Sequence, residues 1–330
     1  MVKQCLTCNK DFVTCLSSIE RGGGKYCSHK CAPAWNKNKK LSKNHIGNLS
    51  KSHKGQHSSV STEFKYKNGS GWYTLLHKHI RETLGKPQNC SICFGIKNVQ
   101  WANKTNNYLR DLNDWIPLCC RCHRRYDLIA KKTDCLLLSA GYGTRLRPIT
   151  NKIPKPLIAI NGKPIIRSII EHLNKYGIYS IIVNTHHLSE MIENYLGEEV
   201  EYSREKKLMG TAGAMGLIKE IVRNRLLVVN SDTLSNVNLF DMFDSHKKSR
   251  CKVTVFTKDN SIHTGGMYLF EKSILDYIPS NKFYSISDDL IPLLIEKKIK
   301  INLFKPNNCI YHDIGTPSKL KIAREYYARN

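Results

Sequence analysis

A glycine-rich turn with cations close by is the stretch of the sequence whose residue types most directly suggest chemistry. Gly141 and Gly143 follow the short apolar segment 135–138, and Arg145 and Lys155 come soon after them. Glycine adopts positive φ readily and lets backbone N–H groups approach an anion closely. The segment therefore predicts a polyphosphate site at the exit of a buried strand. A glycine-rich turn with solvated basic side chains is the simpler alternative.

Closely paired cysteines form a second group of residues with a chemical role. Ten of the thirteen cysteines precede residue 123. In a reducing compartment such pairs are typical of metal ligands, and two pairs supply the four thiolates of a tetrahedral Zn²⁺ site. We predict two structural Zn²⁺ sites, one formed by Cys5, Cys8, Cys27 and Cys31 and the other by Cys90, Cys93, Cys119 and Cys122. A cysteine-rich segment without metal is the alternative.

The basic residues are unevenly distributed along the chain. Residues 1–132 contain 24 Lys and Arg against 7 Asp and Glu, and residues 133–330 contain 28 against 20. Such an excess in the N-terminal part suits a DNA or RNA partner, whereas the C-terminal part has the balance of an ordinary enzyme with anionic substrates. Solvated basic loops give part of this excess, so composition indicates nucleic-acid binding without establishing it.

The sequence shows no sign of secretion or membrane insertion. No apolar run follows Met1, and no stretch approaches the length of about 20 apolar residues that spans a bilayer. We therefore expect a cytoplasmic protein without a membrane partner.

Composition and periodicity divide the chain into four predicted parts. Residues 1–36 form a small treble-clef-like zinc finger, and residues 37–70, rich in Lys, Asn, Ser and His, form a basic flexible linker. Residues 71–132 form a second small zinc-binding domain. In residues 133–330 strands and helices alternate, which predicts an α/β domain with a mostly parallel sheet covered on both faces.

Periodicity also predicts individual elements. Trp72, Leu75, Leu76 and Ile80 have the spacing of an amphipathic helix that ends near Gly85. In the C-terminal part, residues 164–176 form a helix whose inward side chains are Ile165, Ile166, Ile169, Ile170 and Leu173. Residues 209–215 form a loop, and a helix follows over residues 214–221.

Residues 135–160, CLLLSAGYGTRLRPITNKIPKPLIAI, resemble the first loop of the sugar-1-phosphate nucleotidyltransferases, A-G-x-G-T-R-L-x-P-x-T…P-K-P. Residues 183–187 and the Gly-Thr-Ala-Gly segment resemble the mannose- and heptose-1-phosphate guanylyltransferase branch. The resemblance implies a Rossmann-like three-layer domain with a mixed, mostly parallel sheet. It implies nucleotide binding by Ala140, Gly141, Gly143, Thr144, Arg145, Gly210, Thr211, Ala212 and Gly213.

Two later motifs supply carboxylates. Residues 230–232 resemble the Gly-Asp strand end of that family, and residues 311–317, YHDIGTP, resemble its W-x-D-I-G-T-P motif. The resemblance implies that Asp232 and Asp313 bind Mg²⁺, which prefers oxygen ligands.

The implied reaction joins an NTP to a sugar-1-phosphate. The sugar-phosphate oxygen attacks the α-phosphorus of the NTP, pyrophosphate leaves and a nucleotide-sugar forms, with Arg145, Lys155 and Asp232 as the catalytic residues. The branch resemblance favours GTP. One departure stands out, because only 35 residues separate Asp232 from Tyr268 and the family's Glu-Lys-Pro motif for the sugar phosphate is missing. The nucleotide half of the site is therefore expected to be complete and the sugar half shortened.

Residues 113–127, NDWIPLCCRCHRRYD, resemble the end of HNH endonuclease domains. The resemblance implies two strands and a helix, with His123 in the place of a ligand of the catalytic metal. Residues 99–103 occupy the place of the general-base histidine but contain none, so a DNA- or RNA-binding domain is favoured over an active nuclease. The alternative for the whole chain is an HNH-type DNA-binding protein or endonuclease fused to a truncated, inactive nucleotidyltransferase domain.

Overall fold

The computed structural model describes residues 2–5, 11–13, 72–105, 108, 110–130, 132–258, 265–307 and 309–329. The chain divides into two compact units, Met1–Ser61 and Thr62–Asn330. In the first unit, strand β1 (Val2–Gln4) pairs antiparallel with β2 (Asp11–Val13), and Cys5 follows β1 as a buried residue. Cys8, Cys27 and Cys31 of the first predicted zinc site, and the predicted linker 37–70, lie outside the described residues.

A seven-stranded sheet organises the second unit, with the strand order β14-β12-β13-β10-β5-β8-β9. Its strands are β5 (Thr133–Leu138), β8 (Ile181–Thr185), β9 (Glu201–Arg204), β10 (Arg225–Asn230), β12 (Val253–Phe256), β13 (Met267–Glu271) and β14 (Ile301–Phe304). Strands β10, β5, β8 and β9 run parallel, as do β12 and β14, whereas β13 is antiparallel to both of its neighbours. The predicted mixed, mostly parallel sheet is confirmed.

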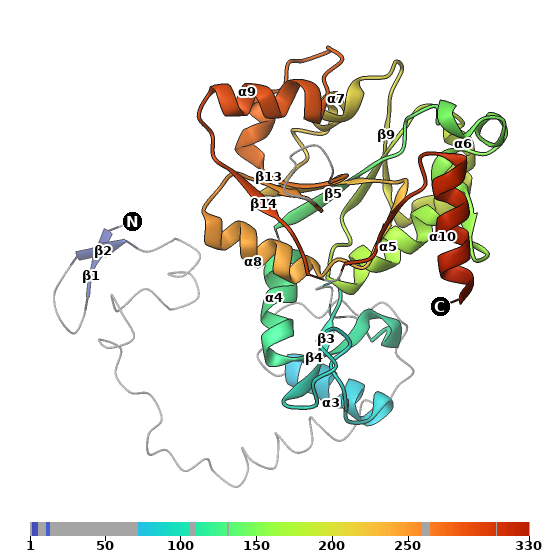
Figure 1. Ribbon diagram of the computed structural model, residues 1–330. Helices are drawn as coiled ribbons and strands as arrows, with labels where there is room; N and C mark the ends of the chain where they lie inside the picture. The colour runs from blue at the N-terminus through green and yellow to red at the C-terminus, as the bar shows by residue number, and fades with distance from the viewer. Residues whose placement is uncertain are drawn as a thin grey trace, which may run out of the picture. The chain divides into compact units, whose positions relative to one another are not determined.

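Alternate residues of the strands face two separate cores. Leu137 and Val229 belong to one core, and Leu136 and Val228 belong to the other, as expected for strands buried on both faces. Helices cover both faces of the sheet (Figure 1). The first core receives α4 (Cys120–Ala130), α5 (Ile165–Lys175), α6 (Ser189–Leu196), α8 (Leu239–Ser249) and α10 (Pro317–Arg329), and the second receives α7 (Gly210–Leu217) and α9 (Ile291–Glu296). Among the described residues, no helix combines the length and the apolar character needed to cross a bilayer.

Helix α5 confirms the periodicity argument, because all five side chains predicted to face inward are buried. The prediction of a loop over residues 209–215 is wrong, since α7 begins at Gly210. The carbonyl of Tyr284 accepts hydrogen bonds from the N–H groups of Ala212 and Gly213 at 2.9 and 3.0 Å. N–H groups in the first turn of a helix have no partner within the helix, so this distant carbonyl supports a helical start that the local sequence does not indicate.

A small ββα arrangement precedes the large sheet. Helix α3 (Trp72–Leu84) is followed by β3 (Val99–Asn103), which pairs antiparallel with β4 (Trp115–Cys119), and α4 begins at the next residue. Leu76, Ile80 and Trp115 form a small apolar cluster. Leu75, expected to face inward, is 66% exposed, because the residues packed against α3 cover only a narrow stripe of it.

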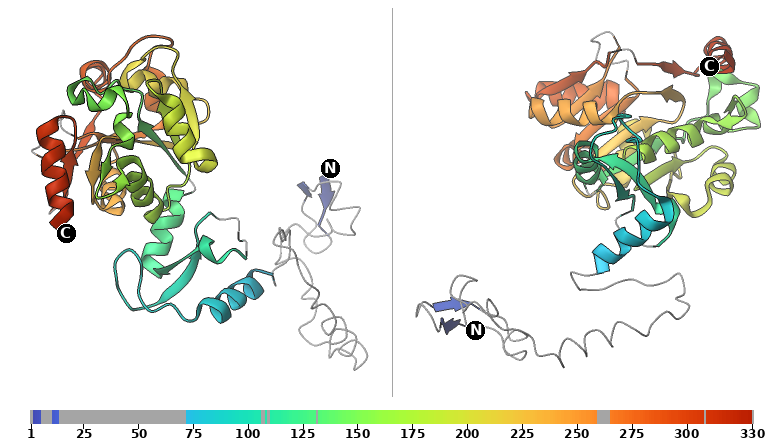
Figure 2. Two further views of the ribbon diagram at one scale, coloured as in Figure 1. Left: turned by 90° about the vertical axis from the view of Figure 1, so that its right-hand side faces the viewer. Right: turned by 90° about the horizontal axis from the view of Figure 1, so that it is seen from below.

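Helix α4 joins this ββα arrangement to the large sheet and contributes to the same core (Figure 2). Cys122, Tyr126 and Ile129 of α4 are buried in the core that also contains Cys135 and Phe240. Residues on the two sides of the expected boundary at residue 132 therefore pack together.

Two short antiparallel pairs complete the second unit: β6 (Ala159–Ile160) with β7 (Lys163–Pro164), and β11 (Thr233–Ser235) with β15 (Tyr311–Asp313). In the sequence, β6 and β7 directly precede α5. In the second pair, β11 follows β10 and β15 precedes α10. The pairing of β11 with β15 brings together two segments that are about 80 residues apart in the sequence.

Candidate active site

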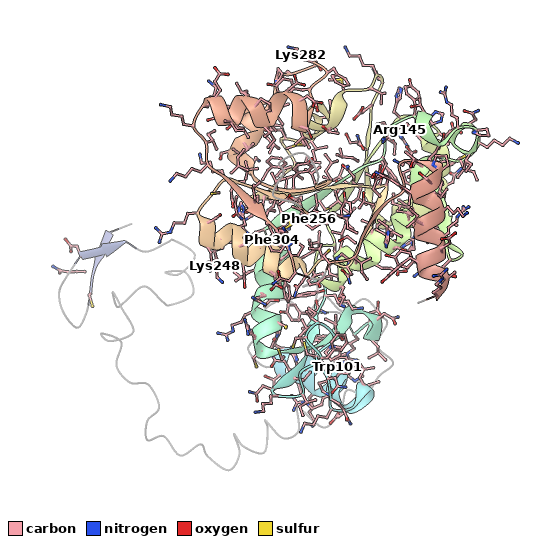
Figure 3. All side chains as sticks on the ribbon, viewed as in Figure 1. Trp101, Arg145, Lys248, Phe256, Lys282 and Phe304 are labelled. Carbon is pink, nitrogen blue, oxygen red and sulfur yellow. The ribbon has the colours of Figure 1, made fainter. Side chains whose placement is uncertain are left out.

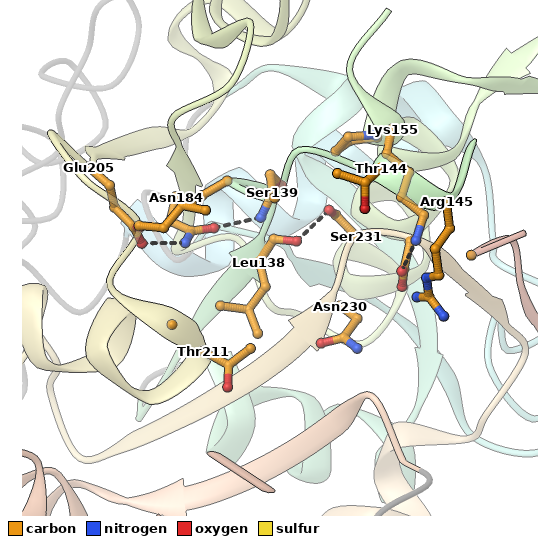
Figure 4. A pocket seen from close by; sticks show the side chains of 18 of the residues that line it. Leu138, Ser139, Thr144, Arg145, Lys155, Asn184, Glu205, Thr211, Asn230 and Ser231 are labelled. Atoms are coloured by element: carbon orange, nitrogen blue, oxygen red, sulfur yellow. Dashed lines mark hydrogen bonds and ion pairs between the residues drawn. The ribbon is translucent and has the colours of Figure 1, made fainter. Parts of the chain in front are cut away.

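A cavity of about 360 Å³ lies at the carboxyl ends of the parallel strands β5, β8 and β10 (Figure 4). Loops that follow neighbouring parallel strands converge at this edge of a sheet, which is where open α/β sheets bind ligands. Its lining includes residues that the sequence predicted: Ala140, Gly141, Gly143, Thr144, Arg145, Lys155, Gly210, Thr211 and Asp232. The remaining lining residues are Leu138, Ser139, Pro156, Asn184, Glu205, Leu208, Asn230, Ser231, Phe283 and Gly315.

The two loop glycines, Gly143 and Gly141, differ in whether another residue would fit at their positions. Gly143 has a φ of +62°, and a Cβ there would lie 2.8 Å from Cγ2 of Thr150, whose hydroxyl donates to the Gly143 carbonyl at 2.8 Å. Only glycine fits this position without strain. Gly141 has no positive φ, and a Cβ would meet nothing within 4 Å. Its small size leaves open space at the cavity wall, where a ligand can approach the backbone.

Two cations reach the cavity from the segment after β5. Lys155 forms an ion pair with Asp232 Oδ2, and their side chains are 13% and 23% exposed. Arg145 is exposed and has no ion pair with any carboxylate in the described part of the chain. A Cβ built on Gly315 would lie 3.0 Å from Nη2 of Arg145 and 2.8 Å from Oδ1 of Asp313, so this glycine allows the two groups to come close. Arg145 is therefore available to an anionic ligand.

Backbone pairing brings the two predicted metal carboxylates to one place. Thr233, next to Asp232, pairs with Asp313 in the β11–β15 ladder, and the Ile314 N–H donates to the Asp232 carbonyl at 3.0 Å. Burial raises the pKa of Asp313, but hydrogen bonds from Lys319 Nζ and the Gly315 N–H, each 2.5 Å long, outweigh it and hold the pKa below 3.8. Two carboxylates from paired strands give the oxygen donors that Mg²⁺ prefers, so these residues fit such a cation.

The opposite end of the cavity contains a hydrogen-bonded chain that the sequence did not reveal. Asn184 Oδ1 accepts from the Ser139 N–H at 2.5 Å, and Asn184 Nδ2 donates to Glu205 Oε1 at 2.7 Å. Glu205 Oε2 accepts from the Met209 N–H at 2.9 Å, and Glu205 is only 6% exposed. No basic side chain among the described residues forms an ion pair with Glu205. The position of Glu205 just after β9 was the one available signal, because β9 is parallel to β8 and ends at the same edge.

The start of α7 places only half of its Gly-Thr-Ala-Gly segment at the cavity. Gly210 and Thr211 line the cavity, whereas Ala212 is fully buried and faces the second core. A Cβ on Gly213 would lie 2.9 Å from Met209 Cβ and 3.1 Å from the Lys282 carbonyl, so this glycine serves close packing. Ala212 and Gly213, expected as nucleotide-binding residues, are therefore not among the residues that line the cavity.

The second predicted group of cysteines converges in the structure. The Sγ atoms of Cys90, Cys93, Cys119 and Cys122 all lie within 4.8 Å of one another. Four thiolates at such separations suit a tetrahedral Zn²⁺ ion. Burial raises the pKa of Cys90, but hydrogen bonds from backbone N–H groups, including those of Cys93 and Cys119, lower it to about 7.

His123 is not part of the four-cysteine cluster. Within the described part of the chain, the four cysteines are the only cluster of three or more side chains with metal-ligand geometry. His123 Nδ1 lies 2.6 Å from Nε2 of Gln100 on β3, and its Nε2 lies 3.7 Å from Asp127 Oδ1. The β3 residue that faces His123 is thus an amide, which cannot take a proton from water as a general base does.

Comparisons with known proteins point to the C-terminal part of the chain. Residues 134–265 match the family model described as nucleotidyl transferase. The UTP--glucose-1-phosphate uridylyltransferase of Synechocystis sp. is 31% identical over 213 residues, which cover 49% of this chain and 55% of that protein. The chain therefore spans about half the length of this relative.

A smaller relative is matched almost completely. The D-glycero-alpha-D-manno-heptose 1-phosphate guanylyltransferase of Aneurinibacillus thermoaerophilus is 27% identical over 226 residues, which cover 58% of this chain and 97% of that protein. Among solved structures, HddC from Yersinia pseudotuberculosis, complexed with GMP-PN, has a TM-score of 0.50 at 22% identity and covers 59% of this chain and 99% of its own. The C-terminal part of the chain is therefore similar to nucleotidyl transferases and has a fold like that of HddC.

Proposed function

We propose that this protein transfers a nucleotidyl group from an NTP to a sugar-1-phosphate, releasing pyrophosphate and forming a nucleotide-sugar. The observation that carries the proposal is that Arg145, Lys155 and Asp232 line the cavity, while Asp313, which is not in the lining, lies on the strand paired next to Asp232. Two cations and two carboxylates around a glycine-rich loop suit a polyphosphate with its metal ion. The names of the relatives support the same reaction class.

The chain's own residues would act by positioning and charge. The open backbone at Gly141 accepts the triphosphate, and Arg145 and Lys155 balance the negative charge that builds up on the α-phosphoryl oxygens as the sugar-phosphate oxygen attacks. A new P–O bond forms at the α-phosphorus, and the bond to the β-phosphate oxygen breaks as pyrophosphate leaves. Such a displacement needs no covalent intermediate on the protein.

Asp232 and Asp313 would hold Mg²⁺. When bound, the ion supplies charge neutralisation and orients the phosphates. In the structure Lys155 and Lys319 are the partners of these two carboxylates. The same lysines can turn to the phosphates once a cation shares the carboxylates, so the charge of the site stays balanced as substrates enter.

We further propose that the base is guanine, and Glu205 supports this assignment. Its two carboxylate oxygens each accept one hydrogen bond, from Asn184 and from the Met209 N–H. Each oxygen keeps a further lone pair. Guanine presents a ring N–H and an amino group on one edge, whereas adenine presents a ring acceptor next to its amino group. A buried carboxylate therefore favours guanine and repels the acceptor of adenine.

The sugar half of the site is the less complete part of the proposal. Residues 259–264, between β12 and β13, lie outside the described residues. Gly266 has a φ of +49°, and a Cβ there would lie 3.1 Å from both Asn230 Nδ2 and the Tyr311 hydroxyl. The segment after residue 264 thus packs closely beside the end of β10, where the sugar phosphate would meet Asp232.

For the N-terminal part we propose a structural Zn²⁺ ion bound by the four clustered cysteines, and nucleic-acid binding by residues 1–132. The convergence of the thiolates supports the first proposal, and the basic composition supports the second. Metal analysis of the full chain with Cys93→Ser and Cys119→Ser should show one Zn²⁺ fewer than the wild type. Binding of DNA that weakens steeply with added salt would support the second proposal, and a protein that ignores DNA at low salt would refute it.

The transferase proposal is tested with the purified full chain, Mg²⁺, GTP and mannose- or heptose-1-phosphate. We expect a nucleotide-sugar detectable by mass spectrometry, and we expect Asp232→Asn to lower its rate of formation about 100-fold or more. Asp276→Asn is the matched control, because Asp276 lies on the surface in an ion pair with Lys219. An Asp232→Asn variant with the wild-type rate would contradict the assignment of the metal site.

A further inference from the structure

A second cavity, of about 460 Å³, lies between α4 and α8 at the opposite edge of the sheet from the candidate active site. Lys132 precedes β5 and Arg225 begins β10, so this cavity borders the amino ends of the strands whose carboxyl ends hold the first cavity. Six basic side chains line it: Arg125, Lys132, Arg225, Lys247, Arg250 and Lys252. Only two acidic side chains, Asp244 and Glu271, accompany them.

Both acidic side chains already have partners. Asp244 forms an ion pair with Arg125. Glu271 Oε1 lies 3.1 Å from Arg225 Nε and 3.0 Å from His246 Nε2. Burial raises the pKa of Glu271, but the hydrogen bond from His246 and the charge of Arg225 outweigh it and leave the pKa below 4.5. The two carboxylates therefore neutralise Arg125 and Arg225 and leave no acidic group for the other cations.

The other four cations, Lys132, Lys247, Arg250 and Lys252, share the cavity without a counter-charge. None of them forms an ion pair with any carboxylate that the structure describes. Like charges gathered in one concave place repel one another, and low-dielectric walls strengthen the field between them. An anion bound at their centre would remove this repulsion.

Two details distinguish the cavity from an ordinary solvated basic surface. Arg250 has a φ of +55° at the C-terminus of α8, a conformation that glycine or asparagine usually adopts and that costs other residues about 1 kcal/mol. The Nε atom of Arg225 is buried, and Glu271 Oε1, 3.1 Å away, pairs with it as an ion without meeting hydrogen-bond geometry. A strained backbone that places a cation, and a buried guanidinium Nε held by charge alone, are features that occur at ligand sites.

We propose that this cavity binds a small phosphate-bearing ligand, of the size of pyrophosphate or a nucleotide. Its volume is in the range of small-molecule sites. Phe240 and Phe243 are buried beneath it, so they close its floor and offer no exposed rings for stacked bases of a nucleic acid. A further hollow beside it has a mixed lining, with the cations Arg121, Arg125 and Lys248 at the end of α8 (Figure 3) and the carboxylates of Asp241 and Asp244. The proposal does not depend on the transferase activity.

The test is a calorimetric titration of the full chain with inorganic pyrophosphate at low salt. We expect the wild type to bind pyrophosphate at two separable sites. The double variant Lys247→Glu/Arg250→Glu should weaken one of them about 100-fold and leave the other unchanged. The matched control is Lys297→Glu/Lys300→Glu, which makes the same change of charge at exposed positions outside both cavities.

Arg250→Gly separates loss of binding from loss of folding. Glycine relieves the positive φ, so this variant should unfold at the wild-type temperature or higher while it binds pyrophosphate more weakly. Equal binding by the wild type, the double variant and the control would overturn the proposal. So would a double variant that keeps pyrophosphate binding but loses binding of a single-stranded DNA oligonucleotide, because the surface would then serve a nucleic acid.

Discussion

Lys155 and Asp232 form an ion pair inside the candidate active site, although they come from segments 77 residues apart. The lysine lies between two prolines after the glycine-rich loop, and the aspartate follows β10. Both side chains are largely buried, so water screens their charges weakly. The pair holds the lysine at the place where we propose that the triphosphate and the cation meet.

The first prediction concerns this lysine. Lys155→Met keeps the aliphatic chain but removes the charge, and we expect pyrophosphate release to fall about 100- to 1,000-fold, since one fixed charge in such a site contributes about 3 kcal/mol to the barrier. Lys152→Met is the control, because Lys152 is exposed and lines neither cavity. A Lys155→Met variant within about twofold of the wild type would exclude a catalytic role for the ion pair.

Glu205 provides a prediction about the choice of nucleotide. Glu205→Gln replaces one acceptor with a donor at nearly constant volume, so a guanine edge would lose a hydrogen bond to a charged group. We expect the ratio of kcat/KM for GTP to that for UTP to fall by about 10- to 100-fold. Glu201→Gln, an exposed residue of β9, should leave the ratio unchanged. An unchanged ratio in Glu205→Gln would show that another group reads the base.

The shared core of α4 and the large sheet is tested at two tyrosines. Tyr126 is fully buried, and its hydroxyl lies 2.6 Å from that of Tyr179. Tyr126→Phe should lower the free energy of unfolding by about 1 kcal/mol, and Tyr179→Phe by a similar amount. The double variant should cost less than the sum of the single variants, because both remove the same hydrogen bond. Urea unfolding followed by circular dichroism measures all three, and additive losses would mean that the two hydroxyls do not interact.

The buried side chain of His172 leads us to predict that the free energy of unfolding falls in acid. Burial lowers the pKa of His172 to about 4, although its hydrogen bond with the Val237 carbonyl, 2.9 Å long, opposes the shift. In the unfolded chain the pKa is near 6.5, so between pH 6.5 and 4 the unfolded state binds the proton more readily and the folded state loses stability as the pH falls. The full difference is about 3 kcal/mol.

His172→Gln should remove this part of the pH dependence. The amide keeps a donor for the Val237 carbonyl but does not titrate, so the free energy of unfolding should fall less between pH 6.5 and 4 than in the wild type. His79→Gln on α3 is the matched control for the substitution itself, because His79 lies outside the core that buries His172. Parallel curves for the wild type and His172→Gln would contradict the prediction.

The parts of the fold that follow from local pattern could be predicted from the sequence. The apolar stripe of α5 and the buried strand β5 depend on periodicity and on run length, and both match the structure. The helical start of α7 could not be predicted, because its first N–H groups depend on the carbonyl of Tyr284, about 70 residues away. A segment with glycines at 210, 213 and 216 has a weak intrinsic preference for helix, so tertiary contacts such as this one and its packing in the second core stabilise it.

The same difference between local motifs and tertiary contacts explains which residues of the candidate site the sequence indicates and which it does not. Gly143, Arg145 and Asp232 belong to contiguous motifs, so sequence alone drew attention to them. Glu205 resembles any charged residue after a strand, and its burial results from contacts with Asn184 and the Met209 N–H. The packing of Tyr126 against Gly177 likewise could not be predicted, because the two residues are far apart in the sequence. The sequence shows only that a basic helical segment is followed directly by a strand.

Pyrophosphate release by the full-length protein tests the central claim most directly. The purified chain is incubated with Mg²⁺ and each of the four common NTPs, with and without a panel of hexose- and heptose-1-phosphates. We predict release that requires both a sugar-1-phosphate and an NTP, is fastest with GTP and is matched mole for mole by a nucleotide-sugar. Absence of release with every pair, from a protein that is folded and binds GTP, would contradict the account.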